Sequence, residues 1–173
     1  DGLTHDAVTN ATATTVDGSI VTWSFSLDSG ENKVYGEMPV FKDAGTYVVY
    51  YKVSADNHQD YYGQFTVTIG KAELVISVSD KSIVVGDEVP SEYKYNVTGL
   101  AEGEELLDVV SDFNITCDYV TTAEIGDKFD IIATGTANNN YNLTIKNGVL
   151  TVVEEITNLV LTENSKLHFS IVN

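Results

Sequence analysis

The strongest strand signal in the chain is the sequence TYVVYYKV at residues 46–53, in which every residue except Lys52 is β-branched or aromatic. Such side chains favour strands because they pack well on a pleated surface. Two further segments, SIVTWSFSL at 19–27 and QFTVTI at 64–69, alternate apolar and polar residues, which is typical of half-buried strands. We therefore predict that these segments form strands. The predicted core face of the first segment carries Val21, Trp23, Phe25 and Leu27.

A second series of strand-like segments follows, and each is bounded by Gly, Asn or Asp. The predicted strands are residues 73–79, 81–85, 92–98, 113–119, 129–133 and 149–153. Only residues 104–110 have helical spacing, and we expect no more than one or two turns there, since short isolated helices are marginal. Many short strands separated by turn residues indicate an all-β protein built as β-sandwiches.

The two series of strands resemble each other. The sequence AGTYVVY at 44–50 matches IGDKFDI at 125–131, and GQFTV at 63–67 matches GVLTV at 148–152. The offset grows slightly between the two matches, so the second copy contains a short insertion. Self-similarity of this kind indicates repeated structural units.

The repeat predicts the domain organisation. We expect one β-sandwich at residues 1–70 and a second at residues 71–153, joined at Gly70-Lys71 with almost no linker. A short connection should hold the two domains in a fixed orientation, which suits an extended rod. Residues 154–173 are a C-terminal strand segment in this interpretation, and we take them as the start of a further module.

The composition excludes several classes of function. The 173 residues include 26 acidic side chains against nine basic ones, all of them Lys, and the net charge is −17. Without Arg the chain lacks the bidentate side chain that reads phosphate and guanine, and an acidic surface repels a phosphate backbone. We therefore expect no nucleic-acid partner. No apolar run approaches the ~20 residues of a membrane helix, so we expect no membrane span in this fragment.

Two sets of residues carry resemblances to known families. Residues 44–53 (AGTYVVYYKV), Asn57 and residues 63–69 (GQFTVTI) resemble bacterial immunoglobulin-like repeats of large Gram-positive surface proteins. The second half resembles the MBG module, another bacterial immunoglobulin-like repeat. Its pattern is carried by KAEL at 71–74, DK at 80–81, GDEVP at 86–90, YNVTGL at 95–100, IGD at 125–127, NYN at 140–142 and NGVLTV at 147–152.

These resemblances imply that the two predicted β-sandwiches are tandem immunoglobulin-like domains. They also imply an adhesin or another wall-attached or secreted protein, in which such modules act as spacers or as binding domains. They supply no catalytic residues.

The sequence contains no arrangement that predicts catalysis. His5, His58 and His168 are scattered over predicted loops and ends, and no Gly-x-Ser-x-Gly motif is present. The single cysteine, Cys117, can form no disulfide within the chain and has no basic neighbour in sequence that would activate it. We expect Cys117 to be a buried core residue. We expect no enzyme, no cofactor and no catalytic residue.

Two loops and one lysine leave alternatives open. Residues 28–32 and 56–60 supply the oxygen ligands that Ca²⁺ prefers, but the same residues form plain turns and neither loop matches the calcium-loop motif. We therefore predict no metal site. Lys52 lies in an apolar strand, where it either faces solvent or is cross-linked to an Asn side chain; the intact mass distinguishes these alternatives, because the cross-link releases ammonia.

The candidate ligand-binding residues are Tyr61, Tyr62 and His58, which lie in or next to the polar loop 56–60. An aromatic ring with one polar end can stack on a sugar ring. Trp23 is in phase with the apolar residues of its segment, and we interpret it as part of the core.

We conclude from the sequence that this is a non-enzymatic, acidic segment of an extracellular bacterial protein, on the cell surface or secreted. It should act as a spacer or stalk and contribute to adhesion. The expected partners are other domains of the same polypeptide and a host glycan or surface protein. Two alternatives remain: a module that binds a glycan or a host protein, and an accessory module of a polysaccharide-degrading enzyme.

Overall fold

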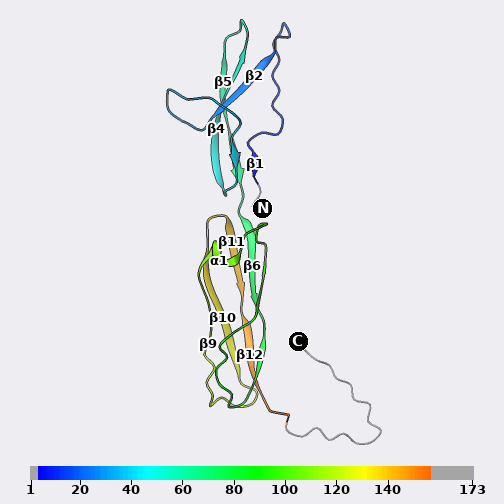
Figure 1. The fold of residues 1–173 in the computed structure, drawn as a ribbon, viewed down its shortest axis with the longest axis vertical. Helices are drawn as coiled ribbons and strands as arrows, with labels where there is room; N and C mark the ends of the chain where they lie inside the picture. Colours follow the sequence, from blue (N-terminus) through cyan, green and yellow to red (C-terminus); the bar gives the residue numbers. More distant parts are fainter. Residues whose placement is uncertain (1–3, 157–173) are drawn as a thin grey trace, which may run out of the picture.

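The computed structural model describes residues 4–156, and its regular elements are strands apart from one helix of four residues. The predicted all-β class is confirmed. The described part of the molecule is elongated: β1 to β5 occupy one end, and β6 to β12 occupy the other (Figure 1). The predicted strand segment at 154–173 lies outside the described residues, except that 154–156 carry no strand.

The N-terminal end contains one three-stranded sheet and one short ladder. β2 (Val21–Ser26), β4 (Gly45–Ala55) and β5 (Tyr61–Ile69) are antiparallel, and β4 lies in the centre. β1 (His5–Asp6) pairs with β3 (Val40–Phe41). The three strands predicted in this half are confirmed. β5 begins earlier than the predicted 64–69, because Tyr61, Tyr62 and Gly63 also pair with β4.

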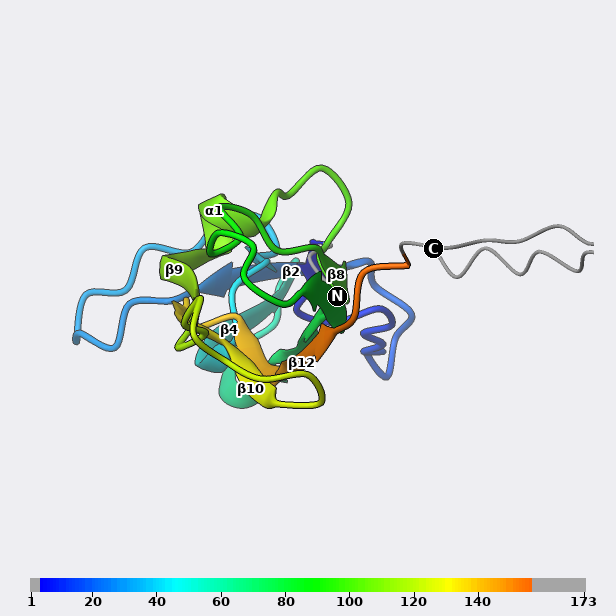
Figure 2. The same cartoon turned by 90° about the horizontal axis from the view of Figure 1, so that it is seen from below.

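The C-terminal end contains two sheets that pack against each other. Their elements are β6 (Ala72–Val78), β7 (Lys81–Val84), β8 (Tyr95–Thr98), α1 (Leu106–Val109), β9 (Val110–Cys117), β10 (Lys128–Ala137), β11 (Tyr141–Lys146) and β12 (Gly148–Val153). The strand orders are β7-β12-β10-β9 and β11-β6-β8, with parallel pairs β11–β6 and β12–β7. Viewed along the long axis, β8, β9, β10 and β12 surround a common centre (Figure 2).

The core between these two sheets is closed. Leu74 and Ile76 on β6, Ile131 on β10 and Leu150 on β12 are fully buried. They alternate with exposed or half-buried residues along each strand, as the period of two requires. One turn of helix, α1, adds Leu106 to the cluster that contains Leu74 and Ile76, and it confirms the short helix predicted at 104–110.

The core of the N-terminal end covers only part of its sheet. Phe25, Phe41 and Val49 are buried together, and Phe41 of the β1–β3 ladder stacks on the Tyr47 ring with centroids 4.1 Å apart. The prediction that Leu27 belongs to this core is wrong: β2 ends at Ser26, and Leu27 beyond it is 54% exposed.

The repeat seen in the sequence corresponds to similar strand pairs. β4 and β5 are antiparallel neighbours, and so are β10 and β12. The second copy contains the additional strand β11, which crosses to the other sheet and pairs in parallel with β6. The sequence analysis did not predict β11, because its Asn-rich surroundings look like a loop.

We predict that Gly99 cannot be replaced without separating β8 from β6. Gly99 has a φ of +96°, and a Cβ atom there would overlap the carbonyl oxygen of Glu73 on β6. Gly99→Ala should therefore lower the free energy of unfolding by more than Gly86→Ala does. Gly86 also has a positive φ, +86°, but a Cβ there meets nothing within 4 Å, so its substitution should cost only about 1–2 kcal/mol of backbone strain. Urea unfolding of both variants measures the difference, and equal losses would contradict the clash.

Candidate functional site

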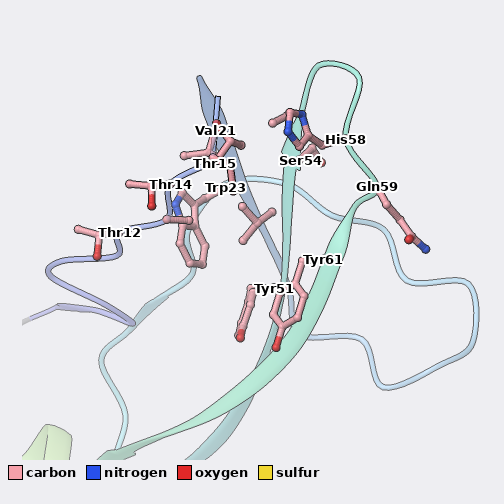
Figure 3. A pocket seen from close by; sticks show the side chains of 14 residues that line it. Thr12, Thr14, Thr15, Val21, Trp23, Tyr51, Ser54, His58, Gln59 and Tyr61 are labelled. Carbon is pink, nitrogen blue, oxygen red and sulfur yellow. The ribbon is translucent and has the colours of Figure 1, made fainter. Parts of the chain in front are cut away.

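A pocket of about 510 Å³ lies at the end of the β2-β4-β5 sheet that is remote from β6. Its walls come from the three strands, from the hairpin between β4 and β5, and from the segment 12–16 (Figure 3). The pocket volume falls in the range that small-molecule sites occupy.

The register of the three strands places the aromatic side chains of the pocket on one face of the sheet. Trp23 on β2 is opposite Val53 on β4, and Val53 is opposite Tyr61 on β5, so these side chains project from one face of the sheet. Val49 and Tyr51 of β4 lie on the same face. The face is closed by the β1–β3 ladder near Val49 and is open near Tyr61, which is 65% exposed.

Three aromatic rings line this open face. The ring centroids of Trp23 and Tyr51 are 5.5 Å apart, and those of Tyr51 and Tyr61 are 6.3 Å apart. Figure 3 shows the two tyrosine rings next to each other with their hydroxyls pointing the same way. Tyr51 occupies the space above Gly63, where any Cβ atom would overlap the Tyr51 ring. The glycine therefore sets the position of the central ring.

Besides the aromatic rings, the lining includes aliphatic side chains and several side chains with hydroxyl or amide groups; the aliphatic ones are Ala13, Val16, Val21, Val53 and Ala55. Thr12, Thr14 and Thr15 come from the segment before β2, and Ser54 and Gln59 come from β4 and the hairpin; Gln59 points away from the other labelled side chains (Figure 3). These groups can donate and accept hydrogen bonds without carrying charge.

His58 is the one titratable imidazole in the lining, and both of its ring nitrogens already have neighbours. Nδ1 lies 2.8 Å from the carbonyl oxygen of Asp56, and Nε2 lies 3.6 Å from Oδ1 of Asp17. Hydrogen bonds from the backbone N–H and the hydroxyl of Ser19 lower the pKa of Asp17 to about 2. His58 therefore connects the hairpin to the segment that precedes β2.

The structure brings together two of the three residues that the sequence suggested for ligand binding. His58 and Tyr61 line the pocket, whereas Tyr62 projects from the opposite face of β5, next to Tyr35 and Asp60. Sequence reasoning did not select Tyr51 as a binding residue, and it assigned Trp23 to the core although the indole is half-buried and lines the pocket. Trp23, Tyr51 and Tyr61 lie on the same face of the sheet. The sequence could have indicated this only if the register of the three strands had been known.

Lys52 and the polar loops have ordinary roles in the structure. Lys52 lies on the polar face of β4, with Nζ 3.6 Å from Oδ2 of Asp60. In the loop 28–32, Asp28 accepts a hydrogen bond from the Gly30 N–H at 2.8 Å, as in a plain turn. Within residues 4–156, no group of three or more His, Cys, Asp or Glu side chains is placed to hold a metal ion. Cys117 is half-buried at the edge of a core cluster, so it is less buried than predicted.

A second feature of interest is the junction between β5 and β6, which are separated only by Gly70 and Lys71. Asn140 precedes β11, and its side chain spans the junction. Its Oδ1 accepts a hydrogen bond from the Ala44 N–H at 2.7 Å, and its Nδ2 donates one to Asp43 at 2.9 Å. The neighbouring Asn139 donates to the Ala44 carbonyl at 3.2 Å.

Charged groups extend the same junction. Lys42 lies 3.9 Å from Glu104, which accepts a short hydrogen bond from the Tyr141 hydroxyl. Burial and this hydrogen bond to Glu104 raise the pKa of Tyr141. The residues around the contact enclose a cavity of only about 10 Å³, so the two ends of the molecule meet closely here.

Residues 74–151 match the family model described as MBG domain (YGX type). They form an MBG-type domain. The match runs from β6 to β12 and includes Asn140, whereas the pocket lies outside it. The resemblance of the second half to the MBG module is thus confirmed, and the immunoglobulin-like repeat in the first half stays a prediction. The search of curated proteins and the search of solved structures found no match. In the part of the chain that the structure describes, no helix has the length and apolarity to cross a membrane.

We predict that Asp17 titrates near pH 2 in the folded protein. Its pKa is below the usual 3.8, so its contribution to stability is present above pH 3.8 and is lost as the pH falls through about 2. An NMR titration of the Asp17 carboxyl carbon measures this midpoint. Ser19→Ala removes the hydroxyl donor but leaves the backbone donor, so it should raise the midpoint part of the way toward 3.8. A midpoint at 3.8 in the unmodified protein would contradict the hydrogen-bonded turn.

We also predict that Gly63→Ala displaces the Tyr51 ring, because the new methyl group takes its place. Trp23 is the only tryptophan of the chain and lies 5.5 Å from Tyr51, so its emission maximum should shift. Gly36→Ala is the control, since a Cβ at Gly36 meets nothing within 4 Å. An unchanged spectrum in Gly63→Ala would show that Tyr51 does not depend on Gly63.

Proposed function

We propose that this chain is a non-enzymatic segment of an extracellular bacterial protein, on the cell surface or secreted, in which two immunoglobulin-like units stand end to end as a spacer. Support comes from the MBG-type domain, since such domains are typical of surface proteins. The strands also divide between two ends of an elongated molecule (Figure 1). Residues 1–70 and 71–153 are the two units in this proposal.

The observation that carries the spacer role is the polar contact at the junction. A connection of two residues permits the two units to bend relative to each other unless other contacts fix the angle between them. Such contacts join three residues of the second unit to three residues of the first: Asn139, Asn140 and Glu104 to Lys42, Asp43 and Ala44. Ala44 is 8% exposed while the two units are in contact, and separating the units would break the hydrogen bond that its backbone N–H donates to Asn140. The contact therefore favours one fixed orientation.

The charge of the chain fits the same role. A net charge of −17 on a chain of this size makes neighbouring copies repel one another. Repulsion of this kind keeps closely spaced stalks on a surface from associating. The force acts over roughly 8 Å at physiological ionic strength and weakens with added salt.

We predict that Asn140→Ala loosens the junction while leaving both units folded. In the unmodified protein, ¹⁵N relaxation should give one rotational correlation time for strands β2 to β5 and for strands β6 to β12. In the variant the two groups should tumble with different correlation times, because two of the hydrogen bonds across the junction are lost.

Asn142→Ala is the matched control. The Asn142 side chain donates to Glu73 within the second unit, so its loss should leave the common correlation time unchanged. Independent tumbling of the two units in the unmodified protein would contradict a spacer of fixed orientation.

A further inference from the structure

We propose that the pocket at the tip of the N-terminal unit binds an uncharged saccharide. This role goes beyond the spacer function, and it concerns residues outside the MBG-type domain. The pocket lies at the end of β4 and β5 that is opposite the junction. Figure 1 shows that this end of the two strands is directed away from β6 to β12.

The aromatic rings supply the surface that a sugar requires. A pyranose ring presents C–H groups on its faces and hydroxyls around its rim, so it is bound by a flat aromatic ring with hydrogen-bonding groups beside it. Tyr51 and Tyr61 lie side by side, and Trp23 adds a third ring 5.5 Å from Tyr51. Both tyrosines also carry a hydroxyl at the edge of this surface.

The polar part of the pocket matches hydroxyl groups rather than charges. Thr12 and Thr14 of the segment 12–16 offer neutral donors and acceptors, whereas the Thr15 hydroxyl donates to the Ser19 carbonyl and Ser54 is hydrogen-bonded to Asp60. The residues that line the pocket include no Asp, Glu, Lys or Arg, and the ring nitrogens of His58 are close to Asp56 and Asp17. An anionic ligand would find no cation in the lining except a protonated His58, and the acidic chain would repel it.

The position of the pocket also argues against an extended peptide as the occupant. Peptides that add to a sheet pair with the backbone of an edge strand. This pocket lies over the face of the sheet, and its lining includes Tyr51 and Val53 of the central strand β4, whose backbone already pairs with β2 and β5. A compact neutral ligand fits such a site better than an added strand does.

Titration of the full chain with neutral disaccharides tests the proposal. The probes are cellobiose, lactose, mannobiose and chitobiose, with sialyllactose as the anionic comparison and a neutral tetrapeptide as the peptide comparison. Excitation of Trp23, the single tryptophan, reports binding at the pocket directly. We expect a saturable change in Trp23 emission with at least one neutral disaccharide, and weaker binding of sialyllactose than of lactose.

Two adjacent tyrosines give a matched pair of variants. Tyr61→Ala removes a ring of the pocket and should weaken binding about tenfold or more. Tyr62→Ala removes a ring of similar exposure on the opposite face of β5 and should leave the affinity unchanged. Tyr61→Phe keeps the ring, so it should retain most of the affinity. Urea unfolding of Tyr61→Ala checks that a loss of binding in that variant is not a folding defect.

Three results would overturn the proposal. One is the absence of a saturable response to every neutral disaccharide. Another is a response that Tyr61→Ala leaves intact, because binding would then lie elsewhere. The third is a response only to sialyllactose or only to the peptide, which would assign the pocket to a different class of ligand.

Discussion

The N-terminal end of the molecule depends on the pairing of β4 on both of its edges. Because β2 and β5 both bond to β4, each residue of β4 is fixed to one face of the sheet, and its neighbours across the strands share that face. Val49 and Tyr51 must therefore lie with Phe25 and Trp23. The ladder that covers this face has only two residues in each strand, so it closes the half around Val49 and leaves the half around Tyr51 open. Core and pocket are thus two parts of one apolar surface.

At the C-terminal end of the molecule, the apolar faces of the sheets are covered. Two complete sheets cover each other, and Leu74, Ile76, Ile131 and Leu150 are buried without residual exposure. This MBG-type domain also supplies Asn139 and Asn140, which bind the backbone around Ala44. These hydrogen bonds join the closed core of the MBG-type domain to the base of the half-open sheet, at the opposite end from the pocket.

Much of this architecture could be predicted from the sequence, because period-two alternation and β-branched residues act locally. The strands around Trp23, Val49 and Phe65 follow from such patterns. The extent to which the β1–β3 ladder covers the apolar face could not be predicted, because it depends on how many residues pair in that ladder. For that reason Trp23 was assigned to a closed core. Tyr61 and Tyr62 were treated alike because the predicted strand began only at Gln64, which left both tyrosines in or next to the loop. Strand β11 was missed because it follows the Asn-rich segment 138–140, which looks like a loop, and because its pairing with β6 is a tertiary contact.

Acrylamide quenching of Trp23 fluorescence tests most directly whether the sheet is open at this end. The single indole gives an unmixed signal, and it is half-buried in the wall of the pocket. We expect clear quenching in native buffer, at a rate between those of a buried and a free indole. If acrylamide quenches Trp23 only after the protein has been unfolded in denaturant, this face of the sheet is closed in the native state. That result would contradict this account.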